Sequence, residues 1–320
     1  TIHKLVIIPD GILGHLPFES LLTTNPSQMH YHKFSYLLED YSVYYEYSAT
    51  ILLANKKQKK ADQLFVGFAP AYNPILNEED TFLTEMPKDY FDDTRSGWNP
   101  LKYNQPEVKQ IAKMVNGVGV LGTEATEASF KEKAKKYQIL HLSMHASAND
   151  QYPDYSHLAF SKNLSEAEDP FLYAYELYNM QLDADLVVLS ACETGTGRLQ
   201  NGEGIMSLAR AFKYAGCPNI VTSYWKAKDD SAQEIMVAFY KYLKEGKHKS
   251  DALRQAKLDY WVGKDGNKAI PSLWAPFVLI GNDLPIEMPD SSINLSPLLW
   301  IVGIAFLGII LWIVTKRKKS

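Results

Sequence analysis

Cysteine is scarce in this sequence, and the two that occur, Cys192 and Cys217, lie far from any partner along the chain. Two cysteines in 320 residues do not make the disulfide framework on which small secreted domains depend. No C-x-x-C pair is present, which excludes the common structural zinc patterns. Each cysteine is therefore either a small buried residue or a reactive thiol, and its surroundings have to decide.

An excess of positive charge is also missing. The chain has 33 Lys and Arg against 37 Asp and Glu, a net charge of -4. Proteins that bind nucleic acid carry a basic patch or stripe, so no nucleic-acid partner is expected. Hydrophobic residues make up 46% and charged residues 22%, which is typical of a globular protein and not of a disordered one.

Long apolar runs are absent except at one end. Residues 298–314 contain no charge, and the basic tail 315–320 follows them. About 20 apolar residues cross a bilayer, so we predict one transmembrane helix at 298–314, joined to the globular part by a linker at 284–297. The basic tail places this end in the cytoplasm and the globular domain on the other side; a tail anchor with a cytoplasmic domain is the alternative.

Strand-like and helix-like segments alternate before that run. The pattern predicts an α/β fold with a mainly parallel sheet that helices cover on both faces. An irregular connection at 71–103, rich in Pro, Asn, Asp and Gly, separates an N-terminal part (1–70) from a second α/β part (104–283). The expected strands are 4–9, 41–48, 64–69, 138–144, 157–161, 185–190, 219–225 and 275–281, and the expected helices are 105–116, 126–137, 204–216, 229–246 and 250–263.

Glycine-rich segments give no support for a cofactor. The G-x-G-x-x-G match at 117–122 follows a helix-like segment, whereas a dinucleotide site needs a strand there. The loop 195–204 lacks the Gly-Lys-Ser/Thr end of a phosphate loop. No cofactor and no metal are expected.

Two residues at strand ends suit nucleophilic catalysis. His145 and Cys192 each follow an apolar strand-like run, and the carboxyl ends of parallel strands meet at one sheet edge. A free thiol titrates near about 8.5, and a nearby imidazole lowers that pKa and accepts the proton. His145 precedes Cys192 by 47 residues, close to the separation of about 50 found in caspases. The backbone N–H groups of Ala146 and Cys192 are candidates for an oxyanion hole.

His141 has a simpler interpretation. It shares one strand face with Ile139 and lies four residues before His145, but the Glu that follows the first His of a helical zinc pair is replaced by Leu142. We interpret His141 as a hydrogen-bonded core histidine. A metal-dependent hydrolase that uses His141, His145 and Cys192 remains an alternative.

Six ordered motifs across residues 2–282 together resemble a CHAT domain, a caspase-like peptidase domain often found beside tetratricopeptide repeats. They are KLVIIPDGILGHLPFESLL, LHLSMHA, LVVLSACETGTG, NGEGIMSLARAFKYAG, IVTSYWKAKDDSAQEIMVAFYKYL and WAPFVLIG. The resemblance implies the three-layer sandwich of caspases, separases and gingipains, with a degenerate N-terminal half at 1–70 and the catalytic part at 104–283. It also implies a dyad of Cys192 and His145, a protein or peptide substrate, and tetratricopeptide repeats upstream in a longer chain.

Alanine at position 146 departs from the family, which usually has glycine after the catalytic histidine. Alanine keeps its backbone N–H but has less conformational freedom than glycine. A membrane-tethered scaffold with little or no activity is therefore the alternative to a membrane-anchored peptidase.

Asp229 and Asp230 follow the strand after the nucleophile and are candidates to recognise a basic P1 side chain; the alternative is that they only begin the next helix.

Overall fold

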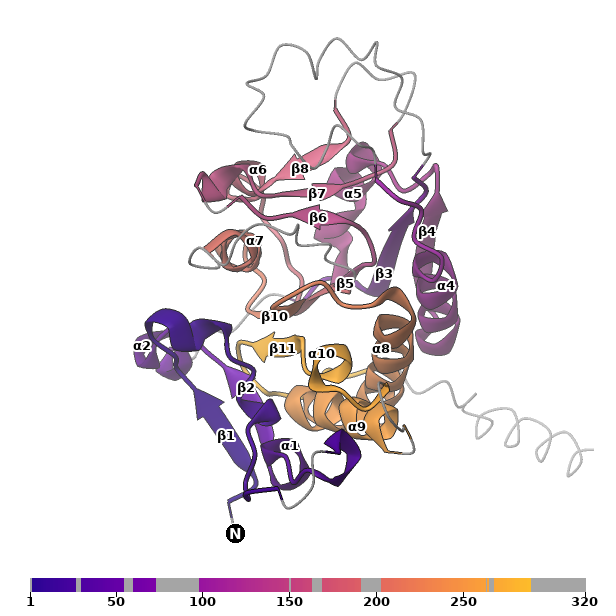
Figure 1. Cartoon of the computed structure of the whole chain (residues 1–320). Coiled ribbons are helices and arrows are strands. Elements are labelled where there is room, and N and C mark those ends of the chain that lie inside the picture. The colour runs from indigo at the N-terminus through magenta and orange to yellow at the C-terminus, as the bar shows by residue number, and fades with distance from the viewer. Residues whose placement is uncertain are drawn as a thin grey trace, which may run out of the picture. The chain divides into compact units, whose positions relative to one another are not determined.

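An eight-stranded sheet forms the centre of the computed structural model, in the order β1-β2-β11-β10-β9-β5-β3-β4 (Figure 1). Among the described residues, every neighbouring pair runs parallel except β10 with β11. The strands are β1 (Lys4–Ile7), β2 (Ser42–Tyr45), β3 (Gln63–Pro70), β4 (Val118–Gly122), β5 (Tyr137–Leu142), β9 (Leu186–Leu189), β10 (Asn219–Ser223) and β11 (Phe277–Ile280).

The structure describes residues 2–26, 30–54, 60–72, 98–149, 151–162, 169–190, 203–262, 264 and 268–288, with side chains left out at 203–207. Residues 1–288 make up one compact unit. Its helices are α1 (Leu37–Asp40), α2 (Ala49–Leu53), α4 (Asn104–Val115), α5 (Glu127–Lys133), α6 (Ala174–Leu177), α7 (Glu203–Tyr214), α8 (Asp229–Lys244), α9 (Lys249–Trp261) and α10 (Pro271–Trp274). Short 3-10 turns lie at η1 (Gly11–His15), η2 (Phe18–Ser20), η3 (Tyr31–Lys33), η5 (Ala134–Lys136) and η6 (Pro153–Tyr155).

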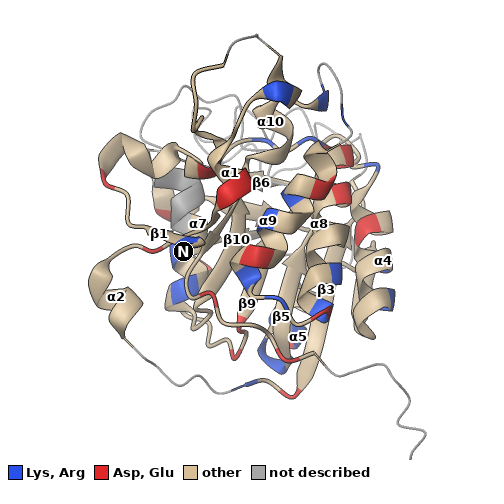
Figure 2. Ribbon diagram, turned by 90° about the horizontal axis from the view of Figure 1, so that it is seen from below, with Lys and Arg blue, Asp and Glu red and all other residues tan. Residues whose placement is uncertain are grey.

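Helices cover both faces of the sheet because each central strand is apolar on both sides. In β9, Val187 and Leu189 pack into one apolar cluster together with α5 and α7. Leu186 and Val188 pack into a second cluster together with α4, α8 and α9. Lys, Arg, Asp and Glu are interspersed along α8 and α9 (Figure 2). The predicted α/β fold with a mainly parallel sheet and three layers is confirmed.

One predicted strand belongs to a different sheet. Residues 157–161 were expected to join the main sheet, but β7 (His157–Ala159) lies between β6 (Ala146–Ser147) and β8 (Phe171–Tyr173) in a small antiparallel sheet. A short apolar run predicts a strand but contains no information about which strand it pairs with. This small sheet begins directly after His145 and therefore belongs to the surroundings of the candidate site.

Strands from the first 70 residues join the same sheet as the later strands. β3 lies between β5 and β4, and β1 with β2 extends the sheet beyond β11. Buried charges also fix this part of the chain: the Lys257 ammonium on α9 donates to the Glu19 carboxylate at 2.5 Å, and the Tyr45 hydroxyl donates to the same carboxylate at 2.7 Å. Burial lowers the pKa of Lys257, and the charge of Glu19 opposes that shift.

The predicted transmembrane helix is corrected. Among the described residues, no helix is long and apolar enough to cross a membrane. The longest of them, α8, has 16 residues and carries charges along its length, whereas a span needs about 20 apolar residues. The segment 298–314 itself lies outside the described residues. The transmembrane helix and the single-pass membrane localisation are therefore not upheld.

Replacement of Lys257 by Met should destabilise the domain by about 3–5 kcal/mol, because it leaves the buried Glu19 carboxylate without its cation. Urea unfolding monitored by circular dichroism measures this loss. Lys264→Met removes the more exposed pair with Glu234 and should cost less than about 1 kcal/mol. The double variant Glu19→Gln/Lys257→Met should recover part of the loss, and a Lys257→Met domain as stable as the parent would contradict the role of the pair.

Candidate active site

Register aligns the ends of the two strands that precede the predicted catalytic positions. β5 and β9 are parallel neighbours in which Leu142 pairs with Leu189, and the Ser190 N–H donates to the Leu142 carbonyl at 3.0 Å. His145 and Cys192 each follow their paired leucine by three residues, a length of chain that spans about 10 Å. Cys192 lies outside the described residues, together with the rest of 191–202, so the dyad itself stays a prediction.

The His145 imidazole is held by a backbone carbonyl. Its Nε2 lies 2.7 Å from the carbonyl oxygen of Asn99. A carbonyl oxygen only accepts hydrogen bonds, so this contact assigns the ring proton to Nε2 and the basic lone pair to Nδ1. The nitrogen that can take up a proton is therefore Nδ1.

Aromatic rings enclose the same imidazole. The Trp98 ring stacks on it with centroids 4.8 Å apart and an interplanar angle of 18°, and the Tyr72 ring lies 4.6 Å away. The Tyr72 hydroxyl accepts the His145 backbone N–H at 3.0 Å and donates to the Ala159 carbonyl at 2.7 Å. His145 is 1% exposed, and these contacts fix both its ring and its backbone.

Burial changes the acid–base behaviour of His145. Desolvation of the ring lowers its pKa to about 4; the Asn99 carbonyl opposes this shift, and the positive charge of Lys226 adds to it. The imidazole is therefore neutral at pH 7 and can act as a base.

The residues that surround His145 were not predicted from the sequence. Tyr72, Trp98 and Asn99 come from the two ends of the segment predicted as an irregular connection, 71–103. Their one signal in the sequence is that large aromatic residues occur in an otherwise polar stretch. Contact with a histidine more than forty residues later in the chain is a property of the tertiary structure.

Ala146 lies where its backbone could serve an oxyanion. It pairs with Leu158 across β6 and β7, and the Ala159 N–H donates to the His145 carbonyl at 2.9 Å. In an antiparallel ladder this pattern marks a pair whose own N–H and C=O groups point away from the partner strand. The Ala146 N–H is therefore directed away from β7. Its role in an oxyanion hole with the Cys192 N–H stays a prediction.

Asp229 and Asp230 begin α8 and differ in their contacts. The Asp229 carboxylate accepts the Tyr103 N–H at 2.9 Å, and burial raises its pKa. The Asp230 carboxylate forms a 2.9 Å ion pair with Lys228 and accepts the Ser231 N–H; these contacts outweigh its desolvation and lower its pKa. Asp229 thus holds the chain just before α4, while Asp230 is 44% exposed. Recognition of a basic P1 side chain by either residue stays a prediction.

His141 is a hydrogen-bonded core residue, as predicted. Its Nε2 lies 2.7 Å from the Glu107 carboxylate of α4, and its Nδ1 lies 3.1 Å from the Tyr240 hydroxyl of α8. All three side chains are buried. Both ring nitrogens are engaged within the core, on the face of β5 that packs against α4 and α8. Within the part of the chain that the structure describes, no group of three or more His, Cys, Asp and Glu could hold a metal ion.

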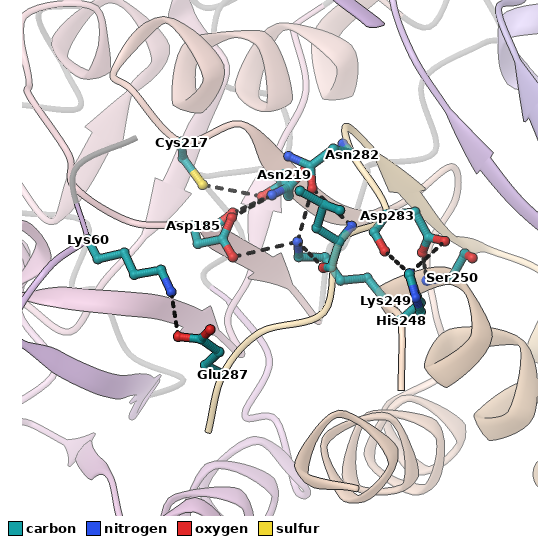
Figure 3. Close-up of polar contacts among 11 residues, drawn as sticks. Lys60, Asp185, Cys217, Asn219, His248, Lys249, Ser250, Asn282, Asp283 and Glu287 are labelled. Atoms are coloured by element: carbon teal, nitrogen blue, oxygen red, sulfur yellow. Dashed lines mark hydrogen bonds and ion pairs between the residues drawn. The ribbon is translucent and has the colours of Figure 1, made fainter. Parts of the chain in front are cut away.

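Cys217 lies in a buried polar cluster at the amino ends of β9 and β10, whereas His145 follows the carboxyl end of β5 (Figure 3). Its thiol donates to the Asn219 carbonyl at 3.2 Å, and burial raises its pKa to about 12, so it is not a nucleophile. In the same cluster the Lys249 ammonium donates to the Leu284 carbonyl at 2.6 Å, and the Asn219 amide donates to Asp185 at 2.7 Å. Asp185 precedes β9 and Asn219 begins β10, so the cluster joins the chain after β11 to the sheet far from His145.

The CHAT domain family model matches residues 1–282. The chain belongs to the CHAT domain family. Tetratricopeptide repeat protein 28 of mouse and of human is 23% identical over 228 residues, covering 62% of this CHAT chain and 9% of each relative. The chain therefore spans about a tenth of the length of these curated relatives.

Solved structures with a similar arrangement were also found. Separase in the Saccharomyces cerevisiae separase–securin complex has a TM-score of 0.46 at 10% identity, covering 85% of this chain and 15% of that one. The Porphyromonas gingivalis RgpB pro- and mature-domain complex has a TM-score of 0.42 at 8% identity, covering 82% of this chain and 59% of that one.

Acid should destabilise the CHAT domain through two buried histidines. Burial lowers the pKa of both His145 and His157 to about 4. Because the unfolded chain binds these protons first, their contribution to stability is complete above about pH 6.5 and is lost as the pH falls toward 4. His157→Gln should reduce the change in unfolding free energy between pH 7 and pH 4.5 by about 2 kcal/mol. Denaturant titrations at each pH measure it, with the exposed His32→Gln as the control; an unchanged pH dependence in His157→Gln refutes the account.

Removal of the Trp98 ring should raise the pKa of His145 from about 4 toward 6.5, because desolvation is the main cause of its depression. Carbon-13 NMR of the labelled histidine ring during a pH titration measures the shift in Trp98→Ala. Tyr31→Ala is the control, since it removes an exposed aromatic ring on η3 that has no part in the shift of His145. A His145 pKa that stays near 4 in Trp98→Ala would show that the ring does not control it.

Proposed function

We propose that this CHAT domain is a caspase-like cysteine endopeptidase whose nucleophile is Cys192 and whose base is His145. The observation that supports the proposal is the register of β5 and β9, in which Leu142 pairs with Leu189. His145 and Cys192 both follow this pair by three positions in the sequence, so we expect them to meet at the carboxyl ends of these strands. The carboxyl ends of parallel strands are where sites form in open α/β sheets.

The proposed reaction divides peptide hydrolysis into two steps. The Cys192 thiol gives its proton to Nδ1 of His145, and its sulfur attacks the scissile carbonyl carbon while the carbonyl oxygen becomes an oxyanion. The N–H groups of Ala146 and Cys192 would bind that oxyanion. Collapse of the intermediate breaks the C–N bond, and the leaving amine takes the proton from His145. Water, deprotonated by His145, then hydrolyses the thioester and releases the acid and the thiol.

The acid–base state of His145 favours one version of this chemistry. A histidine with its pKa lowered to about 4 does not hold a proton at pH 7, so a preformed thiolate–imidazolium pair is disfavoured in this conformation. His145 would act as a general base at the moment of attack. The Asn99 carbonyl orients the ring for that role by fixing its proton on Nε2.

Substrate preference is a further part of the proposal. Asp229 and Asp230 follow β10, the strand next to β9, and their carboxylates would favour a basic P1 side chain. Asp230 is the more accessible of the two, and it has Lys228 as its counter-ion in the free domain. Tetratricopeptide repeats, after which the curated relatives are named, are the proposed regulatory neighbours in the whole protein.

A catalytically weak interaction module is the second candidate function. Ala146, in place of the family's usual glycine, and the enclosure of His145 by Trp98 and Tyr72 both favour it. In that case the domain would keep the fold and bind partners without cleaving them.

Cys192→Ala and His145→Ala should each reduce cleavage in a positional-scanning library of fluorogenic peptides by at least about a thousandfold, because either change removes one half of the dyad. Cys217→Ala is the matched control and should keep full activity, since Cys217 lies at the amino ends of β9 and β10. A peptide acyloxymethyl ketone with Arg at P1 should label Cys192, located by mass spectrometry of the digested protein. Undiminished turnover in Cys192→Ala would overturn the proposal, and an unlabelled Cys192 in a folded, inactive domain would favour the interaction module.

A further inference from the structure

Exposed tyrosines lie on or beside three elements that contact one another, the 3-10 turn η6 and the helices α6 and α7. Figure 1 shows α6 and α7 beside the small sheet. Each of these tyrosines is between 40% and 79% exposed. Tyrosine combines a large flat contact area with a polar hydroxyl and is enriched at interfaces. We name this surface the tyrosine patch; its members are Tyr152, Tyr155, Tyr175, Tyr178 and Tyr214.

Ring contacts join four of the five tyrosines into two pairs. The centroids of Tyr155 and Tyr175 are 5.7 Å apart, and those of Tyr178 and Tyr214 are also 5.7 Å apart. Asp154 links the two pairs, because it precedes Tyr155 and accepts the Tyr178 hydroxyl at 3.1 Å. The four tyrosines of these pairs thus form one group that Asp154 joins.

Carboxylates lie beside part of the patch. Those around Tyr175 are Glu176, Asp169 and the buried Glu127, whose pKa burial raises to about 7; Lys131 forms ion pairs with Glu127 at 2.5 Å and with Glu176 at 2.8 Å. Burial and these carboxylates raise the pKa of Tyr175. Asp154 adds a further carboxylate between the ring pairs, while the positive charge of Arg210 lies near Tyr178. Aromatic faces within a negative field attract cations.

We propose that the tyrosine patch docks a lysine- or arginine-containing extended segment of a partner protein. Its cationic side chains would lie over the tyrosine faces and pair with Asp154, while its apolar stems would cover the rings. The binding is independent of catalysis.

Aromatic contacts connect the patch to the candidate active site. Tyr175 stacks on Tyr173 at 5.3 Å, Tyr173 lies 5.3 Å from His157, and Trp98 lies 6.5 Å from His157 and 4.8 Å from His145. A segment docked on the patch would therefore be held beside the elements that surround His145. This second part, that the docked segment belongs to the substrate, rests on the proposed peptidase function.

Fluorescence anisotropy with a fluorescein-labelled (Gly-Arg)5 peptide tests the docking in the Cys192→Ala background, where cleavage cannot interfere. The peptide should bind, and Tyr155→Ala/Tyr175→Ala should weaken the affinity by about tenfold or more. Asp154→Asn should weaken it less and make it less dependent on salt. Tyr31→Ala removes an equally exposed tyrosine on η3, outside the patch, and should leave the affinity unchanged. Circular dichroism confirms that each variant is folded.

Equal binding of a (Gly-Glu)5 peptide, or an affinity that the patch variants leave unchanged, would overturn the proposal. Sedimentation velocity distinguishes another occupant: if the patch variants abolish self-association of the domain and leave peptide binding unaffected, the surface joins two copies of this chain and the proposal is wrong. Failure of the peptidase proposal has a different signature, because peptide would still bind the patch while the dyad variants changed no cleavage.

Discussion

The parallel pairing of β5 with β9 is the constraint on which the candidate site depends. Both strands are buried on both faces, so their register cannot slip without moving apolar side chains from one helical layer to the other. The pairing of Leu142 with Leu189 therefore fixes where the chain leaves the sheet on each strand. The position of His145, three residues beyond β5, is therefore set by packing in the core, and the same register sets the position of Ser190 at the end of β9.

Burial then determines what His145 can do. Two aromatic rings, a tyrosine hydroxyl and the Asn99 carbonyl all contact this one residue. The carbonyl fixes its tautomer, and burial keeps the ring neutral at pH 7. The same physical effect has the opposite consequence for Cys217, where burial raises the pKa and makes the thiol inert. Polar groups at the two ends of the sheet's strands thus differ: those near His145 fix its ring and tautomer, and those around Lys249 join the chain to the sheet.

The small antiparallel sheet lies between His145 of the candidate active site and Tyr175 of the tyrosine patch along the chain. It begins at Ala146, directly after the candidate base, and its last strand runs into the helix that carries Tyr175. Rings from Trp98 through His157 and Tyr173 lie between the two regions. A rigid aromatic core under the tyrosine patch would hold a docked segment at a defined distance from the dyad, which limits the entropy that docking has to overcome.

The sequence by itself determined the alternation of strands and helices, the mainly parallel sheet, the family, and the interpretation of His141 as a core residue, because these follow from the local periodicity and motifs of the chain. It did not determine that β7 joins a separate sheet, that Glu19 meets Lys257, or that Trp98 and Asn99 enclose His145. Those contacts join segments far apart in the chain, and no local pattern encodes their partners. The apolar run at 298–314 was predicted to span a membrane from its hydropathy alone, and the described structure does not uphold that prediction.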